Sequence, residues 1–405
     1  MASATGAAAQ GIYIAAAKRT AIASFGGSFA KLTATDLATH ASKAAIAACG
    51  VDPAAIDASI WGNVAQTSVD APYLARHAGL RAGMRHGSTA LTLNRLCGSG
   101  FQSVITAAEQ IMLGQAEVVL AGGSESMSQA PLSVYGQAVR FGHRLGMDLT
   151  LQDTLWAALT DSYAQIPMGL TAENLAEKYG ISREDADAYA LQSQMRWKAA
   201  FEAGVFDAEI APVSVKDKKK GAIDIVRDET PRVNATVEAM AKLPPVFKKN
   251  GTVTAANASG IGDGAAALIV TSEAGLTKHN LTPLARLTGW SVSGVDPSIM
   301  GIGPSPAILN VLEHCGITID DVDRIEVNEA FASQCIAVMR DLSLDASRTN
   351  VHGGAIAMAH PLGASGARIT THLANQLAAE GGPGRAIGSA CIGGGQGIAV
   401  VLERV

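Results

Sequence analysis

An internal repeat constrains the fold of this sequence more than any other feature. Residues 45–63 and 310–330 share one pattern: a helix ending in Cys-Gly, an acidic second helix start, Ile/Val-Asp and a strand. The same offset of 266 residues aligns 96–111 with 362–377, and both stretches carry Ser-Gly at a helix start. Agreement at separate places predicts two related α/β halves with the same order of elements. The matched residues are Cys49 and Cys315, Asp57 and Asp323, Ser99 and Ser365, and Gly122 and Gly388.

Each half alternates strand-like and helical segments. In the first half, 11–19, 58–64 and 116–123 read as strands, whereas 34–49 and 100–114 have the apolar spacing of helices. This alternation is typical of βαβ units and predicts a mixed sheet covered by helices.

A different region separates the two halves. Residues 127–261 combine helical pieces with irregular, charged pieces, and we interpret them as an insertion from the first half. Ser182, followed by acidic residues, is the expected cap of a long helix there. The predicted domains are therefore 1–126 completed by 262–283, the inserted loop domain 127–261, and 284–405.

Composition limits the possible functions. The chain has 405 residues, 48% of them hydrophobic, and a net charge of -5, which does not favour nucleic acid or an anionic membrane as partner. Five widely spaced cysteines without a CxxC pair argue against a disulfide framework and a zinc site, so no metal is expected. No apolar run reaches the ~18–20 residues of a membrane span, and the N-terminal segment does not resemble a secretory signal. We expect a cytoplasmic protein of bacterial type, with the mitochondrial matrix as the alternative.

Cys97 stands directly before Gly98-Ser99-Gly100 and a long helical run. The repeat places Gly363 at its position in the second half, so both halves share the helix start and only one carries a thiol. Free N–H groups and the positive partial charge of a helix N-terminus favour a thiolate, lower the pKa of a cysteine and can hold an oxyanion. Two interpretations stay open: a nucleophile, or a small buried apolar side chain, as most free cysteines are.

Cys391 lies in "SACIGGGQG" (389–397), between two strand-like segments. The glycines predict a hairpin with positive φ angles rather than a dinucleotide site, because the GxGxxG spacing and a following helix are missing. By itself Cys391 reads as structural. The repeat, however, places it three residues past Gly388, at the same edge of its half as the loop of Cys97, so two thiols at one edge suggest chemistry.

The second half also carries polar groups that the first half lacks. His360 precedes a proline that fixes the turn, and a neutral imidazole there could take a proton from a thiol. A lone histidine before proline is nevertheless more often a satisfied loop residue. Asn328 follows a strand-like run and aligns with Gly62. Glu329 is a further candidate, although a loop carboxylate is usually solvated.

Longer motifs resemble the thiolase family over essentially the whole chain. They are "NRLCGSGFQS", "GGSESMSQAP", "KLPPVFKKNGTVTAANASG", "VNEAFA", "GGAIAMAHPLGASGARI" and "SACIGGGQGIAV". The resemblance implies the thiolase fold, two similar βαβ-type halves in a five-layered αβαβα core with an inserted loop domain that holds CoA. Within the family, "RFGHRLGMDLTLQDTLWAALTD" and "ALQSQMRWKAA" resemble the mitochondrial 3-ketoacyl-CoA branch.

The resemblance also implies a role for each candidate. Cys97 would carry the acyl group as a thioester, and His360 would activate it. Cys391 would be the acid/base that exchanges a proton with the acetyl-CoA carbanion. Asn328 would hold a water that forms one oxyanion hole with His360, and the backbone N–H groups of Cys97 and Gly393 would form the other.

CoA is implied as a substrate, and no permanently bound cofactor is expected. By resemblance, Arg232 and Ser259 would contact CoA, together with Ala255, Ala330 and Phe331. A basic run could steer the phosphates or could simply be a solvated loop. That run consists of Lys216, Lys218, Lys219 and Lys220.

Three positions depart from the family pattern. His352 stands where the family has Asn, and Ala359 and Ala256 each replace Gly, so each adds a Cβ that would strain a backbone with positive φ. Pro167 stands where short-chain biosynthetic thiolases carry His, which favours longer 3-oxoacyl-CoA substrates.

The implied activity is CoA-dependent cleavage of 3-oxoacyl-CoA to acetyl-CoA and a shortened acyl-CoA, by ping-pong catalysis through a cysteine thioester, in fatty acid β-oxidation. The alternative is an acetoacetyl-CoA thiolase (acetyl-CoA C-acetyltransferase) of ketone or polyhydroxyalkanoate metabolism. A related ketoacyl synthase would lack the second cysteine, and a catalytically silent CoA or lipid carrier is less favoured because the three key side chains are present. The family implies a homo-oligomer, a dimer or a tetramer.

Overall fold

The computed structural model describes residues 4–217 and 221–405, and its first half follows the predicted alternation of strands and helices. The helix predicted at 34–49 spans those residues. It begins after Thr33, which forms a capping box with Asp36, and it ends at Gly50, where φ is 71°. The elements of this half are β1 (Ala4–Arg19), β2 (Ala23–Ser24), α1 (Ala34–Cys49), β3 (Ala58–Gly62), α2 (Leu74–Arg81), β4 (Thr89–Leu93), α3 (Ser99–Met112) and β5 (Val118–Ser126).

The region 127–261 is built from helices and short two-stranded sheets. Its longest helix is α7 (Arg183–Glu202), and the predicted cap is confirmed, because the Ser182 side chain accepts a hydrogen bond from Asp185 N in a capping box. The other elements are β6 (Leu132–Ser133), α4 (Gly136–Arg140), β7 (Gln152–Asp153), α5 (Thr154–Ala158), β8 (Thr160–Asp161), β9 (Ile166–Pro167), α6 (Met168–Lys178), β10 (Val213–Asp217), β11 (Gly221–Ile225) and α8 (Val237–Ala241).

The chain returns to the main sheet at β12 (Gly262–Ser272), which pairs with β1 and β5. The elements after it are α9 (Glu273–His279), β13 (Ala285–Gly294), α10 (Pro304–Cys315), β14 (Arg324–Val327), α11 (Ala332–Leu342), α12 (Ala355–Met358), α13 (Leu362–Ala378), β15 (Arg385–Ile392) and β16 (Gln396–Glu403).

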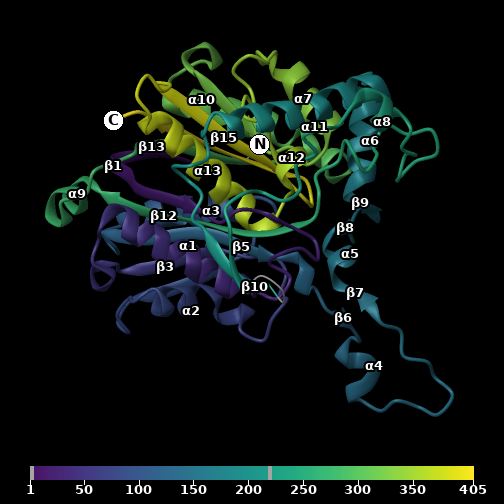
Figure 1. Cartoon of the computed structure of the whole chain (residues 1–405), viewed down its shortest axis with the longest axis horizontal. Helices are drawn as coiled ribbons and strands as arrows, with labels where there is room; N and C mark the ends of the chain where they lie inside the picture. The colour runs from purple at the N-terminus through teal and green to yellow at the C-terminus, as the bar shows by residue number, and fades with distance from the viewer. Residues whose placement is uncertain (1–3, 218–220) are drawn as a thin grey trace.

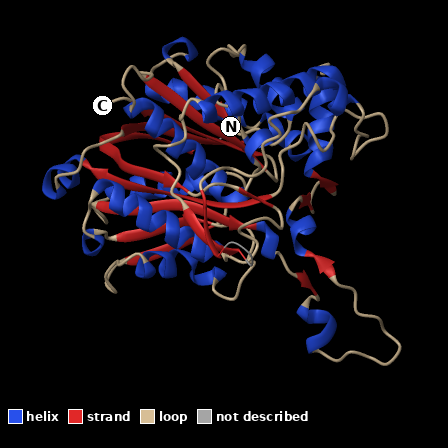
Figure 2. Ribbon diagram, in the orientation of Figure 1, coloured by secondary structure: helices blue, strands red, loops and turns tan. Residues whose placement is uncertain are grey.

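The strand order reflects the repeat. The hydrogen-bonded path runs β14-β15-β16-β13-β1-β12-β5-β3-β4, and β2 pairs with β12. Figure 2 shows the strands in red with the helices around them in blue. Strands β3 and β5 pair in parallel, as do β14 and β15, whereas β1 and β13 pair antiparallel where the halves meet. The prediction of a mixed sheet is therefore confirmed.

Helices cover both outer faces and fill the centre, so that the elements stack in five layers (Figure 1). Helices α1 and α2 lie outside the first-half strands, α10 and α11 lie outside the second-half strands, and α3 and α13 lie between the two sets. The central apolar core takes side chains from both halves, including Phe101, Leu268, Ile369 and Val400. The expected five-layered αβαβα architecture is confirmed.

The two central helices approach each other at their repeated glycines. A Cβ on Gly100 would lie 2.3 Å from the N atom of Ala367, and a Cβ on Gly366 would lie 2.3 Å from the N atom of Phe101. The glycine of the Ser-Gly pair shared by the two halves is therefore explained by this close contact.

One segment extends away from the layered body. Strands β6 and β7 and helix α4 form an arm that projects at the lower right of Figure 1. Several large apolar side chains of the arm are exposed, among them Tyr135, Phe141 and Leu145. Exposed apolar surface of this extent is typical of a contact with another protein surface.

Candidate active site

Cys97 lies in a tight turn between β4 and α3. Leu96, the residue before it, has a φ of 47°, which a residue with a branched side chain rarely adopts. The turn is held by the Asn94 side chain, which accepts from Leu96 N at 2.9 Å, and by the Ser99 hydroxyl, which donates to Leu96 O at 2.7 Å. The thiol is therefore presented by a strained and well-fixed backbone.

The electrostatics at Cys97 differ from the expectation. Although part of the residue is exposed, burial around the thiol raises its pKa to about 11, and the charge of Glu125 adds to this. The N–H groups of Gly393 and of Cys97 itself hydrogen-bond to the thiol and lower its pKa, but burial outweighs them. The N–H groups therefore act on the pKa in the expected direction, but their effect is too small to give a thiolate, so the free protein holds a thiol that needs a base.

Cys391 lies near the end of β15, and the hairpin interpretation of the glycines is confirmed. Strands β15 and β16 pair antiparallel, and Gly394 and Gly395 in the turn have φ of 79° and 85°. Cys391 is fully buried, and burial raises the pKa of its thiol far above the ordinary value; the charge of Cys97 is a second cause. The two thiols are thus close enough to affect each other.

His360 is a buried, neutral base. It is 6% exposed, and burial, followed by the charge of Arg368, lowers its pKa to about 3. The backbone N–H of His360 donates to Gly260 O at 2.8 Å, and its ring Nδ1 lies 2.6 Å from the Ser365 hydroxyl. The Ser365 hydroxyl donates to Pro361 O at 3.0 Å, so it accepts from Nδ1–H. This assigns the proton to Nδ1 and leaves Nε2 free to accept one.

Asn328 follows β14 and faces the histidine ring. Its Nδ2 lies 3.5 Å from Nδ1 and 3.4 Å from Nε2 of His360. Its Oδ1 is buried and has no hydrogen-bond partner among the residues that the structure describes. An unpaired buried amide oxygen is a natural partner for a water molecule or a substrate group.

Only one of the two Gly-to-Ala departures strains the backbone. Ala359, directly before His360, has φ 76° and ψ 172°, a conformation that is nearly exclusive to glycine. Ala256 does not have a positive φ, so the expectation of strain is wrong there. His352, the third departure, places its Nδ1 3.0 Å from Nε2 of His372, whose Nδ1 lies 2.8 Å from Glu209.

A cavity of about 240 Å³ lies among these groups. Its lining includes His360, Leu362, Met168 and Phe331. Cys97 packs in one apolar cluster with Leu362, and Cys391 packs in another with Met168 and Phe331. The imidazole therefore lines this small, largely apolar space, and each thiol packs with residues that line it.

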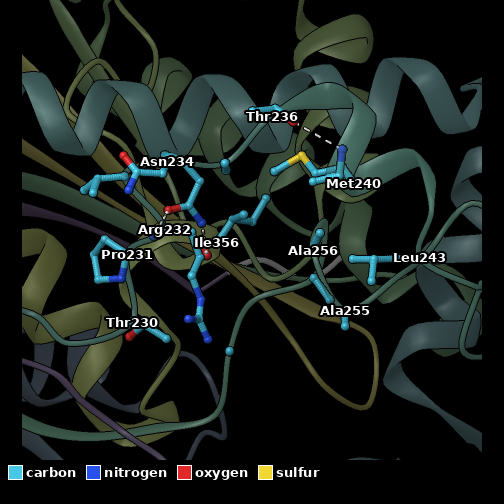
Figure 3. A pocket seen from close by; sticks show the side chains of 16 residues that line it. Thr230, Pro231, Arg232, Asn234, Thr236, Met240, Leu243, Ala255, Ala256 and Ile356 are labelled. Atoms are coloured by element: carbon cyan, nitrogen blue, oxygen red, sulfur yellow. Dashed lines mark hydrogen bonds between the residues drawn. The ribbon is translucent and has the colours of Figure 1, made fainter.

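A larger cavity of about 730 Å³ opens beside the first (Figure 3). Arg232 and Ala255 line it, and Ala258 and Gly260 line both cavities. The inserted region supplies most of its wall, so an extended ligand in this cavity would reach the smaller one past Gly260.

The remaining predicted CoA contacts lie at the junction of the cavities. Ser259 and Phe331 line the smaller cavity, and Ser259 N donates to Ala330 O at 2.9 Å. An isolated bridge joins Ala258 to Phe331. Of the basic run, Lys216 is exposed on β10 and lines neither cavity, and residues 218–220 lie outside the described residues.

Sequence reasoning missed the role of Ser365, which sets the tautomer of His360 and is predicted from the sequence only as part of the repeated helix start. Glu329, a further candidate although a loop carboxylate is usually solvated, is 1% exposed and accepts from the Ser193 and Tyr189 hydroxyls and from Ile356 N. The signal for Ser365 was its place five residues after the histidine.

The described residues hold no cluster of three or more His, Cys, Asp or Glu side chains that could bind a metal ion. None of the helices between residues 4 and 405 that the structure describes combines the length and the apolar character needed to cross a membrane.

These features define a class of protein. Two related α/β halves place a neutral histidine in the wall of a cavity and two thiols among the residues packed around that cavity, an arrangement suited to acyl transfer through a cysteine. The chain belongs to the thiolase family. Residues 12–274 match the family model "Thiolase, N-terminal domain", and residues 281–404 match "Thiolase, C-terminal domain". The family resemblance seen in the motifs is confirmed, and the chain is an acyltransferase.

Individual thiolases are similar over nearly the whole length. The chain is 57% identical to the mitochondrial 3-ketoacyl-CoA thiolase of Homo sapiens, over 97% of this chain and 98% of that protein. It is 47% identical to the acetyl-CoA acetyltransferase of Escherichia coli, over 97% and 98%. The crystal structure of the human mitochondrial 3-ketoacyl-CoA thiolase in complex with CoA superposes with a TM-score of 0.95, at 56% identity, over 98% of this chain and 99% of that one.

Proposed function

We propose that this chain is a 3-ketoacyl-CoA thiolase, which cleaves 3-oxoacyl-CoA with free CoA to give acetyl-CoA and an acyl-CoA shortened by two carbons. The observation that carries the proposal is the small cavity that a neutral His360 lines and whose lining residues pack with Cys97 in one side-chain cluster and with Cys391 in another. The similarity to the human enzyme supports the substrate class.

In the first step, His360 Nε2 takes the proton of the Cys97 thiol as its sulfur attacks the 3-keto carbon. A pKa of about 11 for the thiol means that the proton must be removed during attack, and the neutral imidazole is positioned to receive it. The tetrahedral alkoxide collapses, the bond between C2 and C3 breaks, and the acyl group stays on Cys97 as a thioester.

The electron pair of the broken bond stays on C2 of the departing acetyl-CoA, where the thioester carbonyl delocalises it. Cys391 donates its thiol proton to this carbon and becomes a thiolate. In the second step, Cys391 takes the proton of an incoming CoA thiol, and the CoA sulfur attacks the acyl-Cys97 carbonyl. Acyl-CoA leaves, Cys97 regains the proton held by His360, and both thiols are restored, which gives ping-pong kinetics.

Two sets of donors would stabilise the negative oxygens. The N–H groups of Cys97 and Gly393 converge on the Cys97 sulfur and would hold the oxygen of the group bonded to it. Asn328 and His360 would hold the enolate oxygen of acetyl-CoA, and the unpaired Oδ1 of Asn328 supports a bound water there.

CoA would occupy the larger cavity as a substrate and not as a resident cofactor. Arg232 and Ala255 would contact its nucleotide and pantetheine parts, and Ser259, Ala330 and Phe331 would guide the thiol end past Gly260. This is supported by the shared lining of the two cavities and by the CoA complex of the human relative. For Lys216 the solvated interpretation is favoured, because it lines neither cavity.

We further propose the domain division 1–126 with 262–283, 127–261 and 284–405, and a homo-oligomer, a dimer or a tetramer. The pairing of β12 with β1 and β5 supports the division. The edge strand β4, whose Leu91 is exposed, and the apolar arm support self-association. Similar proteins include mitochondrial and bacterial ones, so a bacterial cytoplasm or a mitochondrial matrix suits the chain.

The alternative is an acetoacetyl-CoA thiolase, which the name of the Escherichia coli relative supports. Chain length separates the two activities. The small cavity is lined by Leu155, Trp156, Leu159 and Phe247, and this apolar wall favours an acyl chain longer than acetoacetyl.

The test is the rate of thiolysis with 3-oxoacyl-CoA substrates of about four to sixteen carbons. Rates that rise beyond four carbons support the proposal, and activity confined to acetoacetyl-CoA refutes it in favour of the alternative. Cys97→Ser should abolish the acyl-enzyme seen by mass spectrometry, whereas Cys391→Ser should still form it from an acyl-CoA. CoA binding without any acyl-enzyme would identify a silent carrier.

A further inference from the structure

Glu125, near the end of β5, is a fully buried carboxylate that the mechanism above does not use. Its Oε1 accepts from Asn63 Nδ2 and Ala65 N, each at 3.0 Å, and its Oε2 accepts from Val64 N at 3.0 Å and Gly363 N at 2.8 Å. A carboxylate offers about four acceptor sites, so all of them are occupied. Protonation of Glu125 would therefore break one of these hydrogen bonds.

The internal repeat gives this position a meaning. The offset of 266 residues carries Glu125 onto Cys391 and Gly363 onto Cys97. At the start of the central helix α13, in the second half, the N–H of Gly363 donates to the carboxylate of Glu125. In the first half, the equivalent N–H belongs to Cys97, and the equivalent side chain is the smaller thiol of Cys391. One anion position is therefore filled by the protein, and the other is left open for a reacting oxygen.

Glu125 also joins the two backbone segments beside the cavity. Val64 packs against the same apolar cluster as Cys97, and its carbonyl accepts from Asn94 Nδ2 at 3.1 Å in the turn that presents the thiol. Gly363 lies in the first turn of α13, shortly after His360. Without the carboxylate, buried donors on both segments would lack a partner, and the two segments would lose their common anchor.

We propose that Glu125 is a positioning residue for acyl transfer, which fixes Cys97 and His360 relative to each other by anchoring the backbone on both sides of the cavity. The inference rests on the proposed function. It also predicts an electrostatic effect, because the negative charge of Glu125 disfavours the thiolate of Cys97. Burial raises the pKa of Glu125 itself to about 7, and the negative charge of Asp263 in β12 also raises it.

Two substitutions separate geometry from charge. Glu125→Gln keeps the size but removes the charge and half of the acceptor sites, whereas Glu125→Asp keeps the charge and shortens the reach. The matched control is Glu329→Gln, because Glu329 is another buried carboxylate with four donors but does not act on the pKa of Cys97. The readouts are kcat and KM in thiolysis and the pH dependence of Cys97 alkylation by iodoacetamide, followed on the Cys97 peptide.

For Glu125→Gln we expect kcat to fall about 100-fold with KM for CoA changed by less than about threefold, because the reacting groups are misplaced but the CoA cavity is intact. The midpoint of the alkylation profile should move to lower pH. Glu125→Asp should lose kcat and keep the midpoint, and Glu329→Gln should keep the midpoint. If Glu125→Gln does not fold, the Asp variant decides by the same kcat criterion.

Turnover of either Glu125 variant within about twofold of the unaltered enzyme would overturn the proposal, as would an increase in KM at unchanged kcat. An alkylation midpoint that stays in place in folded Glu125→Gln would also overturn it. Failure of the proposed function looks different, since the unaltered protein would then show no thiolysis, while its alkylation profile could still be measured.

Discussion

Replacing Ala359 by glycine should stabilise the protein slightly, although it removes a buried methyl group. The backbone at Ala359, with φ 76° and ψ 172°, costs a residue that carries a Cβ on the order of 1–3 kcal/mol. Against this stand about 0.8 kcal/mol for the methyl group and about 0.4–1 kcal/mol for the extra freedom of glycine in the unfolded chain. With mid-range values, relief of about 2 kcal/mol exceeds losses of about 1.5 kcal/mol, so the expected gain is about 0.5 kcal/mol.

Ala357 provides a matched control two residues earlier. It is buried as fully as Ala359, but it lies in α12 and does not have a positive φ. Ala357→Gly therefore loses the same methyl group and about 1 kcal/mol of helix propensity without any relief, a total of about 2 kcal/mol. Urea unfolding at one protein concentration should separate the two variants by about 2.5 kcal/mol.

Equal destabilisation of the two variants would refute the reasoning, because the strain at Ala359 would then be absent. Activity gives a second check. His360 N is held by Gly260 O at 2.8 Å regardless of the side chain at 359, so kcat of Ala359→Gly should stay within about threefold of the unaltered enzyme. A larger change would mean that the methyl group itself positions the histidine.

Ser365→Ala removes the acceptor 2.6 Å from Nδ1 of His360, so kcat should fall about tenfold with KM for CoA unchanged in steady-state thiolysis; a change confined to KM would contradict this. Burial lowers the pKa of His352 to about 4 from 6.5, so the unfolded chain binds more protons in that window, and stability present above pH 6.5 is lost as the pH falls towards 4. Between about pH 7 and about pH 5, the free energy of unfolding of His352→Asn should therefore fall by about 1 kcal/mol less than that of the unaltered protein, a value reduced to allow for the partial exposure of His352. Equal falls for the two proteins in urea unfolding would argue against this. Gly123→Ala would place a Cβ 2.0 Å from Gly363 O and cost about 3 kcal/mol, so soluble yield on gel filtration should drop, and a normal yield would show that the backbone can move.

The fold could be predicted because its signals are local and repeated. The helix at 34–49 carries its own start and stop residues, and the structure has it at those residues. The strand predicted at 58–64 ends at Gly62, because Asn63 and Val64 turn towards Glu125 instead of continuing the ladder. That departure depends on a residue far away in the chain, which no local pattern reveals.

The site could be predicted in its members but not in its electrostatics. The family motifs name Cys97 and His360. His360 lines the smaller cavity, and Cys97 packs with Leu362, which also lines it. The local argument for Cys97, a helix N-terminus that lowers its pKa, considered only neighbours in sequence. Burial comes from the packing of several segments, and it raises the pKa of the thiol to about 11. For the same reason, the buried state of Glu329 could not be read from a loop sequence.

Duplication explains why the two halves share a helix start and yet only one carries a thiol. The glycines at 100 and 366 touch across the two central helices, so this constraint holds in both halves whatever the chemistry. The position three residues before each of these glycines is free to differ. A Cβ on Gly363 would lie 2.9 Å from Oε2 of Glu125 and 2.9 Å from Gly62 O, so a cysteine there has no room. The space that Cys97 uses in the first half is filled in the second by the carboxylate, and the asymmetry of the chemistry follows from that packing.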